Sequence, residues 1–232
     1  MAEAANMQAS YRAVLRKTLI KQGVQIFGIM AACHIICFVL SELLLSETVW
    51  ISIVSTLVVL TMYFFLAWSG GATRGERAVA VTEMTRSQRE AYGREPDERQ
   101  NATLFHPKRA AVASAIAVGL AALCGVAVGL VLHFTIHQGT MAQAIESGFR
   151  MMLAPYLGLA ALLEDALGKA AIYVLIPLGM MLFPAVEYLG FLSGPKQRAK
   201  VHKAIADHAE KVRKRQLREQ KEKRAAQRPP KR

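Results

Sequence analysis

Four long stretches with almost no charged residue dominate the sequence and restrict what the chain can fold into. The first runs from 22 to 45 and has no charge before Glu42. A helix of about twenty apolar residues crosses the roughly 30 Å hydrocarbon core of a bilayer. This stretch is too long for the apolar core of a signal peptide, and no small-residue cleavage site follows it. We therefore expect it to be retained as a membrane-spanning helix.

The other three stretches predict further spans. They cover residues 49–69, 109–134 and 170–192. Backbone groups in lipid must be paired within their own segment, so these spans are expected to be helices. Gly70-Gly71 is expected to end the second helix. The predicted fold is all-α: an integral membrane four-helix bundle in which residues 22–69 form a helical hairpin.

Basic residues are concentrated in three of the connecting segments. Residues 1–21 contain four Lys or Arg, residues 70–109 contain eight, and the residues from Pro195 to the end contain fifteen. The short link between the first two spans contains none. Short cytoplasmic loops of membrane proteins are enriched in Lys and Arg. We therefore expect the N-terminal segment, the polar loop 70–108 and the tail 193–232 to lie in the cytoplasm.

Residues 135–169 are expected on the opposite, extracytoplasmic side. They include an apolar stretch, 151–163, that is bounded by Glu164 and Asp165 and is short for a span. A fifth span there would place the tail, with fifteen basic and four acidic residues from Pro195 onward, outside the cell. An interfacial or re-entrant amphipathic segment is therefore predicted, and a fifth span is the alternative.

Small residues recur at every fourth position of the third stretch. Side chains at this spacing lie along one ridge of a helix, and small residues let helix backbones approach closely in lipid. Packing within the bundle is the favoured interpretation, and a seam between two copies of the chain is the alternative. The ridge consists of Ala113, Ala117, Ala121, Gly125 and Gly129.

Two ionisable side chains lie inside predicted spans. His34 lies near the middle of the first, and Glu187 lies near the cytoplasmic end of the fourth. Ionisable groups inside a membrane are costly and mark candidate functional sites. We expect Glu187 to reach the interface or to pair with a basic residue, and the alternative for both side chains is a proton or solute site. For His34 we expect an interhelical hydrogen bond, for instance to Ser52, Ser55 or Thr56.

Arrangements typical of catalysis or cofactor binding are missing from the sequence. His133 and His137 are spaced like two metal ligands on one helix face, but no HExxH motif accompanies them. The phosphate-binding patterns GxxxxGK[ST] and GxGxxG are also missing. We therefore predict no enzymatic activity, no cofactor and no metal site.

The C-terminal tail is expected to be helical from Lys196 to Ala226, a stretch without Gly or Pro. Acid-before-base pairs four residues apart, such as Glu210 and Lys214, favour a helix. The anionic inner leaflet is the first candidate partner. RNA, including the ribosome, and an acidic protein are alternatives, although the tail has no Phe, Tyr or Trp on which unpaired bases could stack. The expected contact residues are Lys196, Arg198, Lys200, Lys203, Lys211, Arg213, Lys214, Arg215 and Arg218.

Three short motifs add a resemblance. A Pro-Lys element at 105–109 leads into the third span, an FRxxxxPY element covers 149–156, and Tyr-Leu-Gly at 188–190 ends the last span before a basic stretch. Over roughly residues 20–200 the chain resembles small four-span bacterial membrane proteins, many of them from Firmicutes. The resemblance implies the same layout of spans. It implies no catalytic residues, because no activity is assigned to those proteins.

These features predict an accessory or structural protein of the bacterial plasma membrane with both termini in the cytoplasm. A homo-oligomer or a complex with another membrane protein is compatible with the small-residue ridge. One alternative is a small transporter or channel subunit that uses His34 and Glu187. Another is a membrane-protein assembly factor that docks ribosomes through its basic tail.

Overall fold

The computed structural model describes residues 2–44, 49–93, 95, 97–136, 140, 141, 143, 156 and 170–226 of the 232-residue chain. Every regular element in these ranges is helical. The helices are α1 (Ala2–Leu44), α2 (Val49–Tyr92), α3 (Glu98–Thr103), α4 (Pro107–Ile136), α7 (Ala170–Leu192) and α8 (Gly194–Ala226). The chain divides into two units, Met1–Gly194 and Pro195–Arg232.

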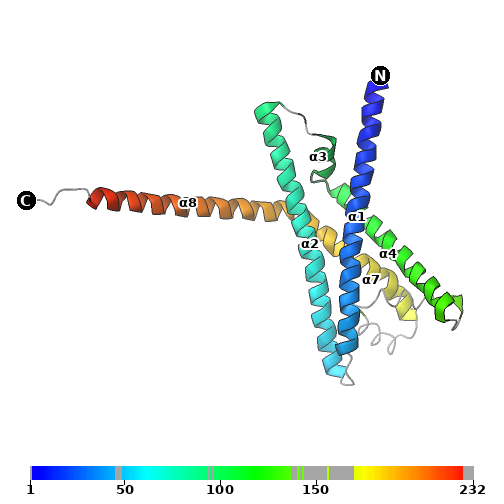
Figure 1. Cartoon of the computed structure of the whole chain (residues 1–232). Coiled ribbons are helices and arrows are strands. Elements are labelled where there is room, and N and C mark those ends of the chain that lie inside the picture. The colour runs from blue at the N-terminus through cyan, green and yellow to red at the C-terminus, as the bar shows by residue number, and fades with distance from the viewer. Residues whose placement is uncertain are drawn as a thin grey trace, which may run out of the picture. The chain divides into compact units, whose positions relative to one another are not determined.

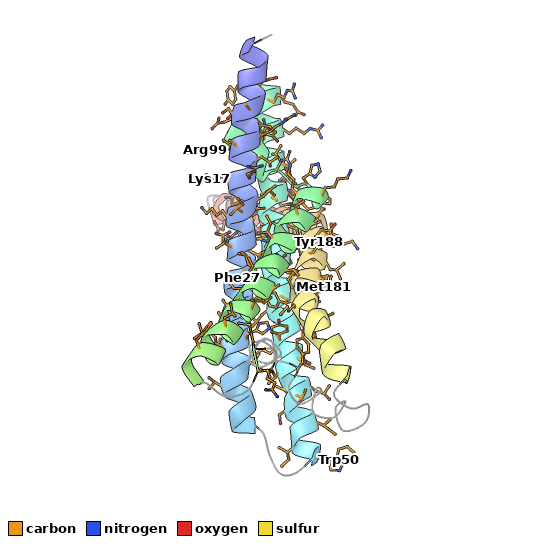
Figure 2. The ribbon with its side chains drawn as sticks, turned by 90° about the vertical axis from the view of Figure 1, so that its right-hand side faces the viewer. Lys17, Phe27, Trp50, Arg99, Met181 and Tyr188 are labelled. Atoms are coloured by element: carbon orange, nitrogen blue, oxygen red, sulfur yellow. The ribbon has the colours of Figure 1, made fainter. Side chains whose placement is uncertain are left out.

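In the first unit, α1 and α2 are long helices that run in opposite directions and lie side by side where α1 ends and α2 begins (Figure 1). The most extensive packing is of α2 on α7 and of α1 on α4, and α4 also packs on α7. Figure 2 shows α4 crossing α1 near Phe27, whose partly buried ring packs on the core. The short helix α3 packs on α1 and α2.

One expected helix end is wrong, and one expected segment belongs to a longer helix. α1 begins at Ala2, so the N-terminal segment 1–21 is largely the first half of one continuous helix. α2 does not end at Gly70-Gly71 but continues to Tyr92, and residues 70–108 are therefore mostly helix rather than loop. An interior glycine costs a helix only about 1 kcal/mol, which tertiary packing of the same helix offsets.

A different glycine ends α2. Gly93 has a φ of 63°, and its N–H donates to the carbonyl of Arg89 over 2.9 Å. A glycine in the left-handed conformation just after the last helical residue is a common helix stop. α3 then begins at an Asp97 cap, whose carboxylate accepts from the backbone N–H of Glu98 over 2.7 Å.

Among the described residues, three helices are long and apolar enough to cross a membrane. The stretches that meet this criterion of length and composition are Ala9–Cys37, Ile53–Tyr92 and Pro107–Val128. α7 covers the range 170–192 expected for the last span, and its described part contains a shorter apolar stretch, Gly179–Leu192. α4 extends two residues beyond the expected 109–134 at each end.

The core of the first unit lies where α1, α2, α4 and α7 meet. Its centre is Tyr63 of α2, which is completely buried against Phe183 of α7 at 4.9 Å between ring centroids. The outward faces of the same helices carry large apolar side chains, such as Ile35, Phe65 and Leu123, each about two-thirds exposed (67%, 66% and 68%). A water-soluble protein rarely exposes apolar patches of this extent.

Most of the segment 135–169 lies outside the described residues, and so does the proposed re-entrant stretch 151–163 apart from Tyr156. The Tyr156 side chain is buried, with ring centroids 5.9 Å from Tyr63 and 6.3 Å from Phe64. At Tyr156, the segment 135–169 therefore contributes to the core.

The second unit consists of the helix α8, which starts two residues before the expected Lys196 and ends at the expected Ala226. Its described side chains from 199 to 220 are all exposed. An ion pair of 2.6 Å between Glu210 and Lys214 joins consecutive turns. The remaining residues, 227–232, lie outside the described part of the chain.

Candidate functional site

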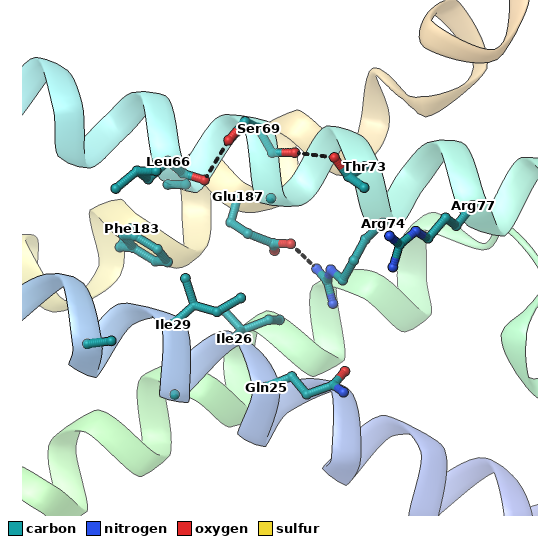
Figure 3. Close-up of a pocket in the computed structure, with 14 residues that line it drawn as sticks. Gln25, Ile26, Ile29, Leu66, Ser69, Thr73, Arg74, Arg77, Phe183 and Glu187 are labelled. Carbon is teal, nitrogen blue, oxygen red and sulfur yellow. Dashed lines mark hydrogen bonds and ion pairs between the residues drawn. The ribbon is translucent and has the colours of Figure 1, made fainter. Parts of the chain in front are cut away.

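A buried ion pair joins α7 to α2. Glu187 of α7 accepts a hydrogen bond from Nη2 of Arg74, which lies on α2 at 113 positions' separation in sequence (Figure 3). The Glu187 side chain is 5% exposed and that of Arg74 is 23% exposed. A carboxylate this deeply buried is stable only with a charged or hydrogen-bonding partner. Pairing with a basic residue was one of the two expectations for Glu187, and the structure supplies Arg74 as the partner.

Arg74 also lies over the ring of Phe191, which is itself stacked on the ring of Phe105. The guanidinium carbon lies 5.7 Å from the ring centroid of Phe191, and Phe191 stacks on Phe105 at 5.0 Å with an interplanar angle of 5°. A cation over an aromatic face is attracted to the ring quadrupole. Nε of Arg74 and Oε2 of Glu187 are nevertheless buried without a hydrogen-bond partner among the described residues.

Glycines bring α2 and α7 close enough for this pairing. A Cβ added to Gly71 would lie 2.8 Å from the carbonyl carbon of Glu187 and 2.9 Å from the backbone nitrogen of Phe191. A Cβ on Gly190 would come equally close to the backbone of Trp68. One turn further along α2, Gly75 approaches Gly194, the first residue of α8, in the same way. The α2 backbone thus meets the end of α7 and the start of α8 through reciprocal glycines at four-residue spacing, a known mode of close helix packing.

The expected small-residue ridge lies on a different interface. Ala113, Ala117 and Ala121 of α4 are completely buried in the core, and Gly125 is buried as well. Opposite them on α1, a Cβ on Gly23 would lie 3.1 Å from the carbonyl oxygen of Ala113. For Gly129, only its place in α4 is described. The buried part of the ridge therefore faces helices of its own chain.

His34 is held by hydrogen bonds inside the bundle. Its Nδ1 lies 2.7 Å from the carbonyl oxygen of Met30, which can only accept, so Nδ1 carries the proton. Nε2 then accepts from the hydroxyl of Tyr63 at 3.4 Å, and the two rings meet edge to face at 5.3 Å. Tyr63 is not among the hydroxyl partners expected from the sequence, which were Ser52, Ser55 and Thr56.

The structure does not join His34 and Glu187 into one site. The partner of His34, Tyr63, and the partner of Glu187, Arg74, are eleven residues apart on α2, which is about 16 Å along a helix. Ala67 and Phe183, both buried and apolar, occupy the intervening turns of α2 and α7. Each ionisable side chain therefore has its own local partners.

A groove opens beside the ion pair, between α1, α2 and α7. Its volume is about 670 Å³, and Figure 3 shows Leu66 and Phe183 toward one end and Arg74 and Arg77 toward the other. A smaller hollow of about 190 Å³ adjoins it, and Gln25, Arg74 and Arg77 line both. The groove thus has an apolar end and a basic end. A groove with two such ends suits a ligand that has both a charged and an apolar part.

No group of three or more His, Cys, Asp or Glu side chains placed to hold a metal ion occurs in the described part of the chain. Of the two histidines considered as ligands, His133 is described only by its place in α4, and His137 lies outside the described residues. The three cysteines are free thiols, with Cys33 and Cys37 buried. No protein-family model, curated protein or solved structure matches the chain.

Proposed function

We propose that the chain is a multi-pass protein of the bacterial plasma membrane, with an accessory or structural role and no catalytic activity. In this proposal α1, α2, α4 and α7 cross the membrane, and both termini lie in the cytoplasm. The basic helix α8 binds the anionic inner leaflet.

The outward faces of the helices support the membrane assignment. Side chains such as Ile35, Val58 and Phe65 are more than half exposed, and in lipid such exposure carries no hydrophobic cost. α7 supports a fourth span, because its 23 residues match the thickness of a bilayer core. An even number of spans returns the C-terminal tail to the side of the N-terminus.

The observation that carries the functional proposal is the charge and exposure of α8. The helix has twelve Lys or Arg against four Asp or Glu, and its described side chains from 199 to 220 face solvent. A basic residue near an anionic leaflet contributes about 1 kcal/mol of attraction. α8 contains no Phe, Tyr or Trp and so lacks the large rings on which nucleic-acid bases usually stack. Its chemistry therefore favours a surface of lipid phosphates.

We expect α8 to bind vesicles that contain phosphatidylglycerol and to stay free on vesicles of phosphatidylcholine alone. The test uses the full chain, reconstituted with an environment-sensitive dye on Ala209→Cys and with the native cysteines replaced by alanine. Dye emission is expected to rise in anionic vesicles, and high salt is expected to abolish the rise, because salt screens surface charge.

Two variants of α8 test whether its positive charge, rather than its particular sequence, causes the rise in dye emission. Replacing Lys203, Lys211, Lys214 and Arg218 together by glutamine is expected to remove the rise. The matched control, Gln216→Asn with Gln220→Asn, changes α8 at two positions without changing its charge and is expected to keep the rise. Equal emission in anionic and neutral vesicles would contradict the proposal. Ribosomes that sediment with the full chain but not with a chain ending at Gly194 would favour ribosome docking instead.

A further inference from the structure

We propose that the groove between α1, α2 and α7 binds one anionic phospholipid, with its phosphate at the basic end and an acyl chain along the apolar end. The inference rests on the membrane assignment, because lipid must surround the groove. It goes beyond the tail, which is a separate unit of the chain.

The basic end has positive charge that the described carboxylates do not neutralise. Arg77 is exposed and forms no ion pair among the described residues. Arg109, which lines the adjoining hollow, donates to the hydroxyl of Tyr11 at 2.7 Å and to the carbonyl of Asn101 at 2.6 Å, both neutral acceptors. Arg74 adds a buried Nε–H with no acceptor. Arginine N–H groups are the preferred partners of phosphate oxygens.

The apolar end has an open wall and room for part of an acyl chain, the rest of which would lie in the surrounding lipid. On α1 the groove runs from Gln25 to Ala32, a rise of about 10 Å over eight residues. Ile29 and Leu66 line it and are 50% and 38% exposed, so a chain can enter from the side. A Cβ added to Gly28 would meet nothing within 4 Å, so this glycine leaves open space.

The shape and charge of the groove select among occupants. A free phosphate ion would use the arginines but leave the apolar end empty. A zwitterionic lipid carries its own cation next to the phosphate, which the arginines would repel. A cation would find the buried carboxylate that lines the groove, that of Glu187, already paired with Arg74. An anionic phospholipid matches both ends at once.

The experiment counts lipids that stay on the full chain in mild detergent, by native mass spectrometry, after addition of phosphatidylglycerol or phosphatidylcholine. Gly70→Leu fills the groove, because nothing lies within 4 Å of a Cβ at Gly70. Gly119→Leu is the matched control, since Gly119 has the same open space on α4 but does not line the groove. Arg77→Gln removes the exposed charge at the groove. Arg99→Gln is the matched control, because Arg99 is an exposed arginine on α3.

We expect the wild type to retain one phosphatidylglycerol in preference to phosphatidylcholine. Gly70→Leu and Arg77→Gln should each lower its affinity about tenfold, the loss expected for one charge-assisted hydrogen bond or an equivalent contact. Both controls should bind as the wild type does, and circular dichroism and melting should show all four variants folded. An excess of inorganic phosphate should not displace the lipid.

The inference would be overturned if Gly70→Leu retained phosphatidylglycerol as the wild type does, if the wild type retained phosphatidylcholine equally well, or if inorganic phosphate displaced the lipid completely. The quadruple glutamine variant of α8 separates this proposal from that of the tail. That variant should keep the groove lipid while it loses binding of α8 to anionic vesicles. A chain that stays in the membrane fraction after alkaline extraction but retains no lipid would refute the groove proposal alone.

Discussion

Replacing Gly71 by alanine is expected to destabilise the bundle by about 3 kcal/mol, at the upper end of the range for overpacking a close contact. The added Cβ would lie less than 3.0 Å from backbone atoms of Glu187 and Phe191 on α7. Backbone atoms of a packed helix cannot move away from the added Cβ, whereas a flexible side chain could change its rotamer. The two helices must therefore move apart, and the Arg74–Glu187 pair lengthens with them.

The neighbouring glycine is the matched control for this change. A Cβ on Gly70 meets nothing within 4 Å, so Gly70→Ala is expected to be neutral or to stabilise α2 by up to about 1 kcal/mol, the gain in helix propensity. Gly190→Ala is expected to destabilise the bundle as Gly71→Ala does, because Gly190 lies on the α7 side of the same contact. The measurement is reversible unfolding in detergent or bilayers. Equal stabilities of Gly71→Ala and Gly70→Ala would show that α2 and α7 do not meet through these glycines.

Loss of Arg74 is expected to cost more than loss of the charge on Glu187. Arg74→Met leaves a carboxylate that is 5% exposed without its counter-charge, and breaking a buried pair in this way costs about 3 kcal/mol or more. Glu187→Gln leaves an arginine that is 23% exposed. That guanidinium can still reach polar surroundings and can still donate to the amide oxygen, so a cost of about 1 kcal/mol is expected.

The double variant Arg74→Met with Glu187→Leu removes both charges and is expected to recover most of the stability lost in Arg74→Met. Buried ion pairs can often be replaced by apolar residues of similar volume without loss. The same unfolding measurement applies, with Arg86→Met as a control at an exposed ion pair with Glu90. Equal destabilisation by Glu187→Gln and Arg74→Met would contradict the expectation that the more deeply buried partner is the costlier one to leave unpaired. If the double variant were as unstable as Arg74→Met, the cost would not come from an unpaired charge.

Hydropathy was sufficient to predict an all-helical chain and the bounds of α7. Apolar stretches of about twenty residues have few alternatives to a helix when they are uncharged throughout. The tail followed from composition, because residues 196–226 contain neither glycine nor proline and carry acid-before-base pairs. These are local properties that a short window of sequence contains.

Helix pairing was not predictable in the same way. Gly70-Gly71 was expected to end α2, because local propensity gives glycine no reason to lie inside a helix. The reason is an approach to Gly190 and Gly194, more than a hundred residues away. The four-residue spacing of Gly71 and Gly75, repeated at Gly190 and Gly194, was the available signal.

The partner of each ionisable residue also depends on pairing. Glu187 was expected near a basic residue, but the choice of Arg74 follows from the contact of α2 with α7. Because α2 was expected to end at Gly70-Gly71, Arg74 was assigned to the polar loop. Tyr63 was likewise not among the expected partners of His34, although it is completely buried beside that ring.

Thiol labelling in intact cells tests the central claim, a four-span bundle with its basic tail inside the cell. Single cysteines are placed in a variant without Cys33, Cys37 and Cys124, and a membrane-impermeant maleimide is added before or after lysis. The positions are Glu90, Thr140 and Glu210. Four spans predict that the cysteine at 140 is labelled in intact cells and that those at 90 and 210 react only after lysis. Labelling of position 210 in intact cells would contradict the account.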